Sequence, residues 1–201
     1  MSPQPSVPAL PLIDGRFRAL LFDCDGTLAD TAELHHFSLS TAIRELGHEM
    51  PKQWYLARVG LSLDPLLREF QEHCGEALAP EAVQPLQEDV FCKSVQKVRG
   101  INSVIDIAKE YAGKVPLAVV SGSSRRMVRA TLEALDIHNL FSAVITVESV
   151  TRPKPAPDAY LEAARLLGVP PESCLAFEDS DQGLEAARLA RMTTCDVRTM
   201  Q

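Results

Sequence analysis

RALLFDCDGT, residues 18–27, joins a short apolar run to two aspartates. Ala19 to Phe22 has the uninterrupted apolar pattern of a strand that is buried on both faces, as in a parallel sheet. Asp23 and Asp25 follow directly, and a glycine then ends the strand. Residues i and i+2 share a face of a strand, so both carboxylates are expected on one side of its carboxyl end, where open α/β sheets bind their ligands.

Asp23 and Asp25 would repel each other there, and each is costly to bury unless a cation lies between them. A hard divalent ion with oxygen ligands, most simply Mg²⁺, removes that cost. The alternative is a turn in which Asp25-Gly26 only reverses the chain, as Asp-Gly often does. The rest of the sequence has to decide between a metal site and a turn.

Composition restricts the class of protein. The 201 residues are 46% apolar and 23% charged, enough for a packed core in one domain or in a core with a modest insert. The net charge is −7 and lysine and arginine form no run, which argues against a nucleic-acid or anionic-membrane partner. No apolar stretch is long enough to span a bilayer, and the N-terminus lacks the pattern of a signal peptide.

The cysteines indicate a reducing compartment. They are five in number, scattered, and form no C-x-x-C pair, which is typical of reduced cytoplasmic thiols and not of disulfides or a zinc site. Cys24, between the two aspartates, should face the opposite side of the strand and be buried. A cytoplasmic monomer or small homo-oligomer is expected.

The chain divides into three parts. Residues 1–16 form a Pro-rich extension, residues 17–30 and 99–201 an α/β core, and residues 31–98 an all-helical insert. The first helix of the insert should begin near Asp30, capped by Asp30 or Thr31.

After Gly100, helices and strands alternate. Strands are predicted at 117–120, 143–147, 174–177 and 192–197, and helices at 104–111, 125–135, 158–167 and 184–190. This rhythm predicts an α/β fold, a doubly wound parallel sheet with helices on both faces and an inserted all-helical cap domain.

Polar side chains follow each successive strand. The second is followed by Ser121-Gly122-Ser123-Ser124, the third by Lys154 between two prolines, and the fourth by Glu178-Asp179. Each has a simpler interpretation alone, such as a helix cap for the serines or a solvated charge for the lysine. Together they predict a metal site and a phosphate cradle, in which carboxylates hold Mg²⁺ while Lys154 and Ser121 surround a dianion.

These motifs, in this order, resemble those of the haloacid dehalogenase superfamily of phosphotransferases, of the type with a helical C1 cap. The resemblance spans about Arg18 to Arg198. More narrowly, the chain resembles the branch of beta-phosphoglucomutase and fructose-1-phosphate phosphatase, through residues 30–35, 138–141, 154–158 and 195–198.

The resemblance implies roles for the catalytic residues. Asp23 would be the nucleophile that forms an aspartyl-phosphate, and Asp25 the acid and then the base. Ser121 and Lys154 would stabilise charge on the transferring group, and Gly122 would help to bind substrate.

The same resemblance implies a metal site. Asp23, the backbone carbonyl of Asp25, and Asp179 would bind Mg²⁺, with Glu178 as a further ligand or as a partner of the ligands. His35 matches a histidine that contacts substrate or the moving cap in relatives. Arg58 and Trp54 could face the substrate, although helix packing for Trp54 and a solvated charge for Arg58 are simpler interpretations; Asp181 could cap the last helix.

We therefore expect a Mg²⁺-dependent phosphatase that acts on a small phosphorylated metabolite, with fructose 1-phosphate or a related hexose phosphate as the leading substrate. A sugar phosphate mutase is the alternative, but Val59 and Leu63 stand where cations for a distal phosphate would be sought, and Asp64 adds a repelling charge. A fold relative that binds without turnover is a third possibility, against which the complete set of Asp23, Asp25, Lys154 and Asp179 argues.

Overall fold

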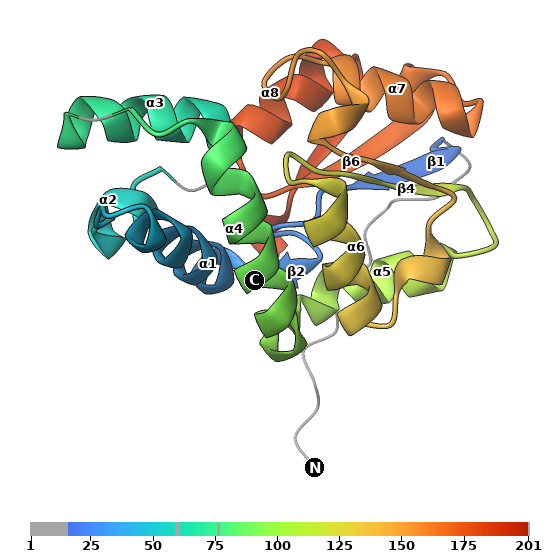
Figure 1. The fold of residues 1–201 in the computed structure, drawn as a ribbon. Coiled ribbons are helices and arrows are strands. Elements are labelled where there is room, and N and C mark those ends of the chain that lie inside the picture. The colour runs from blue at the N-terminus through green and yellow to red at the C-terminus, as the bar shows by residue number, and fades with distance from the viewer. Residues whose placement is uncertain (1–15, 59–60, 76, 201) are drawn as a thin grey trace.

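A five-stranded parallel sheet lies at the centre of the computed structural model, which describes residues 16–58, 61–75 and 77–200 (Figure 1). The predictions for residues 1–15 and for Val59 lie outside the described residues. The strand order β5-β4-β1-β6-β7, with every neighbouring pair parallel, confirms the predicted doubly wound α/β class. The strands are β1 (Ala19–Phe22), β4 (Leu117–Val120), β5 (Ala143–Ile145), β6 (Cys174–Glu178) and β7 (Thr193–Asp196).

Helices cover both faces of the sheet, which explains the continuous apolar pattern of β1. Leu20 and Phe22 pack with α5 (Asn102–Tyr111) and α6 (Arg125–Ala134). The alternate residues of β1 pack with α7 (Asp158–Leu167) and α8 (Asp181–Leu189) on the other face. Cys24 is buried in the same cluster as Leu20 and Phe22, as predicted, and all five cysteines are free thiols.

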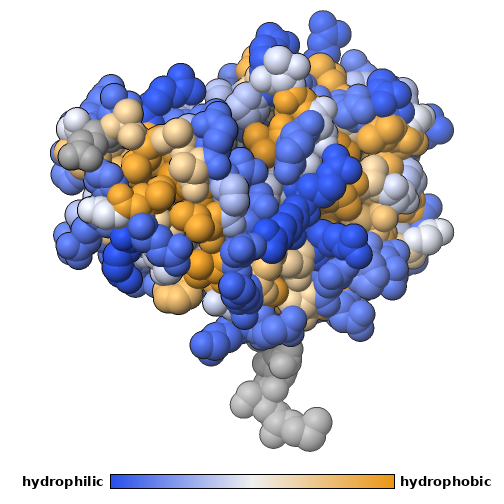
Figure 2. Space-filling model, in the orientation of Figure 1, coloured by the Kyte–Doolittle hydropathy of each residue, from blue (hydrophilic) through white to orange (hydrophobic). Residues whose placement is uncertain are grey.

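Four helices lie between β1 and the rest of the core: α1 (Ala32–Glu45), α2 (Lys52–Leu56), α3 (Leu63–Cys74) and α4 (Pro80–Ser94). We call them the helical insert. They pack around a hydrophobic cluster of their own that includes Leu39, Ile43, Leu67 and Phe70. In the view of Figure 2, hydrophobic residues reach the surface of the insert between α3 and the α1–α2 pair.

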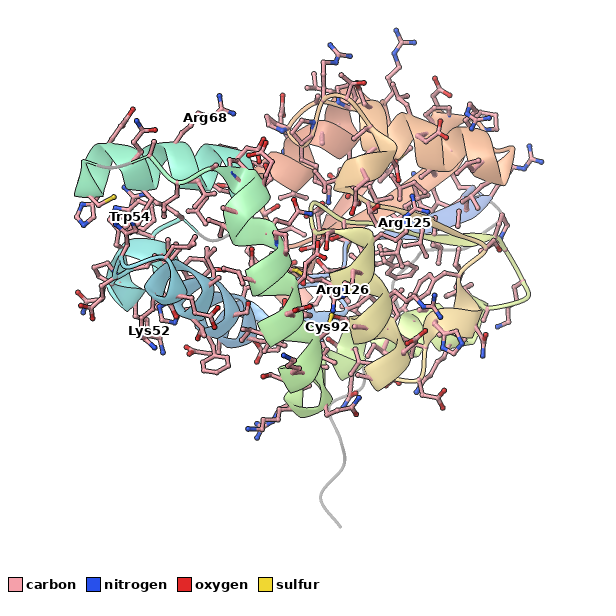
Figure 3. The ribbon with its side chains drawn as sticks, in the orientation of Figure 1. Lys52, Trp54, Arg68, Cys92, Arg125 and Arg126 are labelled. Carbon is pink, nitrogen blue, oxygen red and sulfur yellow. The ribbon has the colours of Figure 1, made fainter. Side chains whose placement is uncertain are left out.

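One helix of the insert, α4, packs directly on α6 of the core. Phe91 and Val95 are buried there against Met127. At the edge of this seam the guanidinium of Arg126 pairs with Asp89 at 2.6 Å, and Cys92 lies beside Arg126 (Figure 3). The insert therefore has a fixed apolar contact with the core on this side.

The two segments that connect the insert to the core pair with each other. The short strands β2 (Ala29–Asp30) and β3 (Arg99–Gly100) form a separate antiparallel sheet, with Asp30 opposite Arg99. We did not predict these strands, because two residues are too few to show the alternation that identifies a strand.

Several boundaries differ from the predicted ones for identifiable reasons. β5 ends at Ile145 and not at residue 147, because Thr146 caps a 3₁₀ turn, Val147–Ser149, and its amide donates to Oγ of Ser149 (3.1 Å). The last helix begins at Asp181 and not at residue 184, since the hydroxyl of Ser180 caps it. By contrast, β4 and α7 have the predicted limits.

Neither Asp181 nor Thr31 makes the capping hydrogen bond expected of a helix cap. Asp181 does not cap α8 but is its first residue, and its carboxylate pairs with Arg198 at 2.9 Å. Thr31 does occupy the N-cap position of α1, yet its side chain makes no capping hydrogen bond. Its hydroxyl is used elsewhere, as described below. None of the described helices has both the length and the apolar composition needed to cross a membrane.

Candidate active site

The carboxyl ends of three neighbouring strands bring the predicted polar residues together. β1 lies between β4 and β6, so Asp23, Ser121 and Glu178, which follow or end these strands, meet at one edge of the sheet. Lys154 reaches the same place from the loop after β5. Its ammonium donates to Oδ1 of Asp23 at 2.8 Å, to the carbonyl of Val120 at 2.8 Å and to Oε1 of Glu178 at 2.5 Å.

Lys154 is buried and fully engaged. Its side chain is only 10% exposed, so the ammonium is held between two carboxylates and away from bulk water. Burial disfavours its charge, but Asp23 and Glu178 outweigh that cost and raise the pKa of Lys154 above its ordinary value. A permanently charged donor therefore stands beside Asp23.

Asp23, Glu178 and Asp179 form an acidic group in which one carboxylate oxygen from each residue lies within 4.8 Å of the others. Burial raises the pKa of Asp23 well above its ordinary value; Lys154 opposes this shift, and Glu178 and Asp179 add to it. Burial, reinforced by Glu178, likewise raises the pKa of Asp179 to about 6. The three carboxylates are thus crowded beyond what the single lysine compensates.

These residues fit a divalent cation with oxygen ligands. Oδ2 of Asp23 is buried and has no hydrogen-bond partner among the described residues, although buried polar atoms are nearly always paired. A hard cation bound at the acidic group would pair with that oxygen and offset the repulsion between the carboxylates.

Two glycines allow the carboxylates of this group to lie against the backbone. Gly26 has a φ of +85°, and a Cβ at that position would lie 2.0 Å from Oδ2 of Asp179. At Gly183 a Cβ would lie 2.0 Å from the carboxylate carbon of Glu178. Any larger residue at either position would displace a carboxylate of the acidic group.

Asp25 has a different set of partners from Asp23. Its Oδ1 accepts a hydrogen bond from the hydroxyl of Thr31 (2.8 Å) and lies 2.8 Å from Nε2 of His35. Its Oδ2 accepts hydrogen bonds from the hydroxyls of Ser121 (3.2 Å) and Ser123 (2.7 Å). The side chain of Asp25 thus connects the first helix of the insert to the serine turn after β4.

These partners determine the charge of Asp25. Burial alone would raise the pKa of Asp25, but His35, Ser123 and Thr31 outweigh it and lower the pKa well below its ordinary value. Asp25 is therefore ionised in this arrangement. Its carboxylate is not part of the acidic group around Asp23.

His35 lies in the site with its ring against Asp25. Its predicted contact with substrate or the cap stays a prediction. Gly122 is exposed at the turn, with open space beside its Cα. We missed the parts played by Ser123, Thr31 and Tyr160. Ser123 stands two residues after Ser121 in the hydroxyl turn, and that spacing was the available signal; Thr31 had been assigned to helix capping. The buried hydroxyl of Tyr160 donates to Oε1 of Glu178 at 2.7 Å, and the sequence alone gave no indication of this contact.

Arg58 and Trp54 contact each other within the insert. The guanidinium of Arg58 lies 4.1 Å from the ring centroid of Trp54, and its Nε donates to Glu69 at 2.7 Å. Trp54 also packs edge-on against Phe70. Packing is therefore the better interpretation of Trp54, and Arg58 is held by Glu69 and the indole.

An open groove of about 550 Å³ lies apart from this site, along the seam of α4 and α6. Its charged residues largely satisfy each other: Arg126 pairs with Asp89, Arg129 pairs with Glu133, and Glu148 accepts from the amide of Arg125. The groove therefore has fewer unpaired charged side chains to offer a ligand than the strand-end site.

Comparison with known proteins agrees with this arrangement. Residues 20–197 match the family model of the haloacid dehalogenase-like hydrolases. Fructose-1-phosphate phosphatase YqaB of Escherichia coli is 34% identical over 194 residues, covering 92% of this chain and 98% of YqaB. Hexitol phosphatase B of E. coli is 29% identical, covering 87% of this chain and 80% of that protein.

Comparison with solved structures supports the same family. CbbY from Rhodobacter sphaeroides in complex with phosphate superposes with a TM-score of 0.81 at 28% identity, covering 89% of this chain and 84% of CbbY. The chain belongs to the haloacid dehalogenase-like hydrolases. The enzyme class and the branch of beta-phosphoglucomutase and fructose-1-phosphate phosphatase expected from the sequence motifs are thereby confirmed.

Proposed function

We propose that the protein is a Mg²⁺-dependent phosphatase that hydrolyses a small sugar phosphate monoester through an aspartyl-phosphate on Asp23. The observation that carries the proposal is the convergence of Lys154, the unpartnered Oδ2 of Asp23 and the carboxylates of Glu178 and Asp179. A carboxylate nucleophile, a fixed cation and a divalent metal site are the parts that phosphoryl transfer requires. The similarity to sugar phosphatases over nearly the whole chain supports the substrate class.

In the first step, a carboxylate oxygen of Asp23 forms a bond to phosphorus while the bond from phosphorus to the sugar oxygen breaks. The leaving oxygen takes a proton, which we assign to Asp25. Lys154, already at 2.8 Å from Asp23, stabilises negative charge on the transferring group, and Ser121 adds a hydroxyl donor from the turn after β4. Mg²⁺ held by Asp23, Asp179, Glu178 and the carbonyl of Asp25 would neutralise charge on the phosphoryl oxygens.

In the second step, Asp25 accepts a proton from water as the water oxygen attacks phosphorus, and the bond to Asp23 breaks to release phosphate. The contacts of Asp25 with Thr31, His35, Ser121 and Ser123 support this step, because they favour the ionised carboxylate that accepts the proton. For the first step, Asp25 must be protonated and must exchange some of these partners for the leaving oxygen.

We further propose that the helical insert is a cap over this site and sets the choice of substrate. Its first helix already contributes His35 to the partners of Asp25. Arg58, a cation of the insert, is held by Glu69 and Trp54, which favours a substrate with one phosphate over a bisphosphate. Fructose 1-phosphate and related hexose phosphates are the leading substrates.

Phosphate release from a panel of phosphate esters in the presence of Mg²⁺ tests the proposal, with fructose 1-phosphate, other hexose phosphates and p-nitrophenyl phosphate included. Asp23→Asn should lower kcat by more than ~10³-fold because it removes the nucleophile. Asp106→Asn, an exposed aspartate of α5, is the matched control and should leave kcat unchanged.

Two outcomes would contradict this function. Conversion of glucose 1-phosphate to glucose 6-phosphate that depends on a bisphosphate primer would establish a mutase. Absence of phosphate release across the whole panel would favour a protein that binds without turnover.

A further inference from the structure

Tyr160, the third residue of α7, contacts both members of the buried ion pair between Lys154 and Glu178. Its hydroxyl donates to Oε1 of Glu178 at 2.7 Å, and the ammonium of Lys154 lies 5.2 Å from the centroid of its ring. Tyr160 is completely buried. A buried tyrosine needs a partner for its hydroxyl, and here that partner is a carboxylate of the acidic group.

The two carboxylate oxygens of Glu178 have different partners. Its side chain is fully buried, and Oε1 receives hydrogen bonds from both Lys154 and Tyr160. Among the residues that the structure describes, Oε2 receives only the longer hydrogen bond from Ser180, at 3.2 Å. A Cβ at Gly183 would lie 2.0 Å from the carboxylate carbon of Glu178, so the absence of a side chain there leaves room for this carboxylate. Oε1 is thus already occupied by two donors, whereas Oε2 retains capacity to accept.

We propose that Tyr160 is a positioning residue, whose hydroxyl holds Oε1 of Glu178 toward Lys154 and thereby leaves Oε2 for the divalent cation. The inference rests on the proposed function, because it assumes a cation at Asp23, Glu178 and Asp179. It assigns Tyr160 no contact with substrate or with the reacting phosphoryl group.

The hydroxyl matters because Lys154 is shared between two carboxylates. Oε1 of Glu178 and Oδ1 of Asp23 both accept from the same ammonium. The tyrosine hydroxyl supplies part of the hydrogen bonding that Oε1 requires, so Glu178 competes less for Lys154. Without it, Glu178 would turn or draw the ammonium away from Asp23, since a buried carboxylate is costly to leave with fewer donors.

The alternative is that Tyr160 only fills the core. Its ring belongs to the hydrophobic cluster formed by the inner face of β1, α7 and α8. A phenylalanine would fill that space equally well. The two interpretations therefore differ in the hydroxyl alone, and Tyr160→Phe separates them.

The test compares Tyr160→Phe with Tyr111→Phe in the full-length protein. Tyr111, at the end of α5 on the other side of the sheet, has its hydroxyl beside Glu110 and serves as the matched control. Titration calorimetry with Mg²⁺ should show a dissociation constant about 10-fold to 100-fold higher for Tyr160→Phe, the usual loss when a partner of a metal ligand is removed. With the substrate found in the phosphatase panel, kcat should fall while KM changes little, because the hydroxyl touches no part of the substrate.

A double-mutant cycle identifies the residue through which Tyr160 acts. In the Glu178→Gln background, Tyr160→Phe should change Mg²⁺ affinity by much less than in the wild-type background, because the two residues are coupled through one hydrogen bond. Equal losses in both backgrounds would overturn the proposal.

A measurement on protein of the wild-type sequence tests the proposal even if Tyr160→Phe does not fold. The chain has three tyrosines, so fluorine NMR of protein labelled with 3-fluorotyrosine gives three resonances. Tyr55→Phe and Tyr111→Phe assign two of them, and the third then belongs to Tyr160 without a variant at that position. The Tyr160 resonance should shift on addition of Mg²⁺ with the midpoint found by calorimetry, and that of Tyr111 should not.

The outcomes separate this inference from the proposed function. If wild-type protein binds Mg²⁺ and releases phosphate while Tyr160→Phe matches Tyr111→Phe in both respects, the role of Tyr160 is wrong and the proposed function stands. If the wild-type protein neither binds Mg²⁺ nor releases phosphate, both are wrong.

Discussion

Nε2 of His35 lies 2.8 Å from Oδ1 of Asp25, so the first helix of the insert contacts the loop that follows β1. Both side chains are largely buried, with exposures of 14% and 24%. Because His35 lowers the pKa of Asp25, the position of the insert influences the charge of Asp25.

His35→Ala should lower kcat about 10²-fold, the lower end of what a general acid–base group contributes. Loss of the imidazole should also raise the pKa of Asp25, which His35 holds below its ordinary value. Asp25 would then become protonated at higher pH, and the acidic limb of the pH–rate profile should move upward. His138→Ala, at an exposed position, is the control; an unchanged profile for His35→Ala would show that the pair has no catalytic part.

Thr31→Val should lower the free energy of unfolding by about 2 kcal/mol, because the buried hydroxyl donates to the charged Oδ1 of Asp25. Thr131→Val is a matched control, since Oγ1 of Thr131 is buried and has no hydrogen-bond partner in the described part of the chain. Its replacement should be neutral or stabilising. Urea unfolding of both variants measures the difference, and equal effects would contradict the assigned hydrogen bond.

Gly183→Ala should weaken Mg²⁺ binding and cost about 1–3 kcal/mol of stability by overpacking against Glu178. An alanine inside a helix would otherwise stabilise it by ~0.5–1 kcal/mol relative to glycine. Gly122→Ala, where a Cβ would meet nothing within 4 Å, should leave stability nearly unchanged. Calorimetry and urea unfolding test both variants, and a more stable Gly183→Ala would show that Glu178 is free to move.

Removal of Mg²⁺ should make stability depend on pH. Burial and Glu178 raise the pKa of Asp179 from 3.8 to about 6, so the metal-free fold favours protonated Asp179. The contribution of protonated Asp179 to the free energy of unfolding is present below about pH 4 and is lost as the pH rises through about 6. It amounts to up to about 3 kcal/mol, because each pKa unit corresponds to about 1.4 kcal/mol.

Mg²⁺ should therefore stabilise the protein more at pH 7.5 than at pH 4.5, as measured by urea unfolding with chelator and with excess Mg²⁺. Asp179→Asn should flatten the slope in the metal-free protein. We expect the free energy of unfolding of the metal-free protein to fall between pH 4 and 6. A rise over this range would contradict the predicted cost of ionising the buried Asp179.

Much of the fold was predictable because strong periodicity coincides with burial. β4 and α7 begin and end where the sequence pattern placed them, since one is a continuous apolar run and the other is bounded by proline and glycine. The two-residue strands β2 and β3 were not predictable, because their pairing depends on the whole insert returning to its starting point.

The site was predictable at the level of which residues converge, but not of how they are connected. The prediction that Asp23, Lys154 and Glu178 lie together required only their positions at strand ends. It required no knowledge of their hydrogen bonds. The partners of Asp25 come from two separate regions, the start of α1 and the turn after β4. Tertiary packing determines whether the hydroxyl of Thr31 caps a helix or binds a carboxylate. Tyr160 follows Lys154 by six residues, a spacing that alone does not reveal a shared carboxylate.

The pairing of Asp30 with Arg99 makes the insert exchangeable in principle. The chain leaves the core and re-enters it at adjacent positions, so the strands of the sheet keep their order whatever is spliced between them. A shorter or longer helical module could replace this one without altering Ser121, Lys154 and Glu178, which lie at the carboxyl ends of β4, β5 and β6. Diversification of substrate range on such a scaffold needs only a new module grafted at one narrow neck, provided that the module replaces the contacts that Thr31 and His35 make with Asp25.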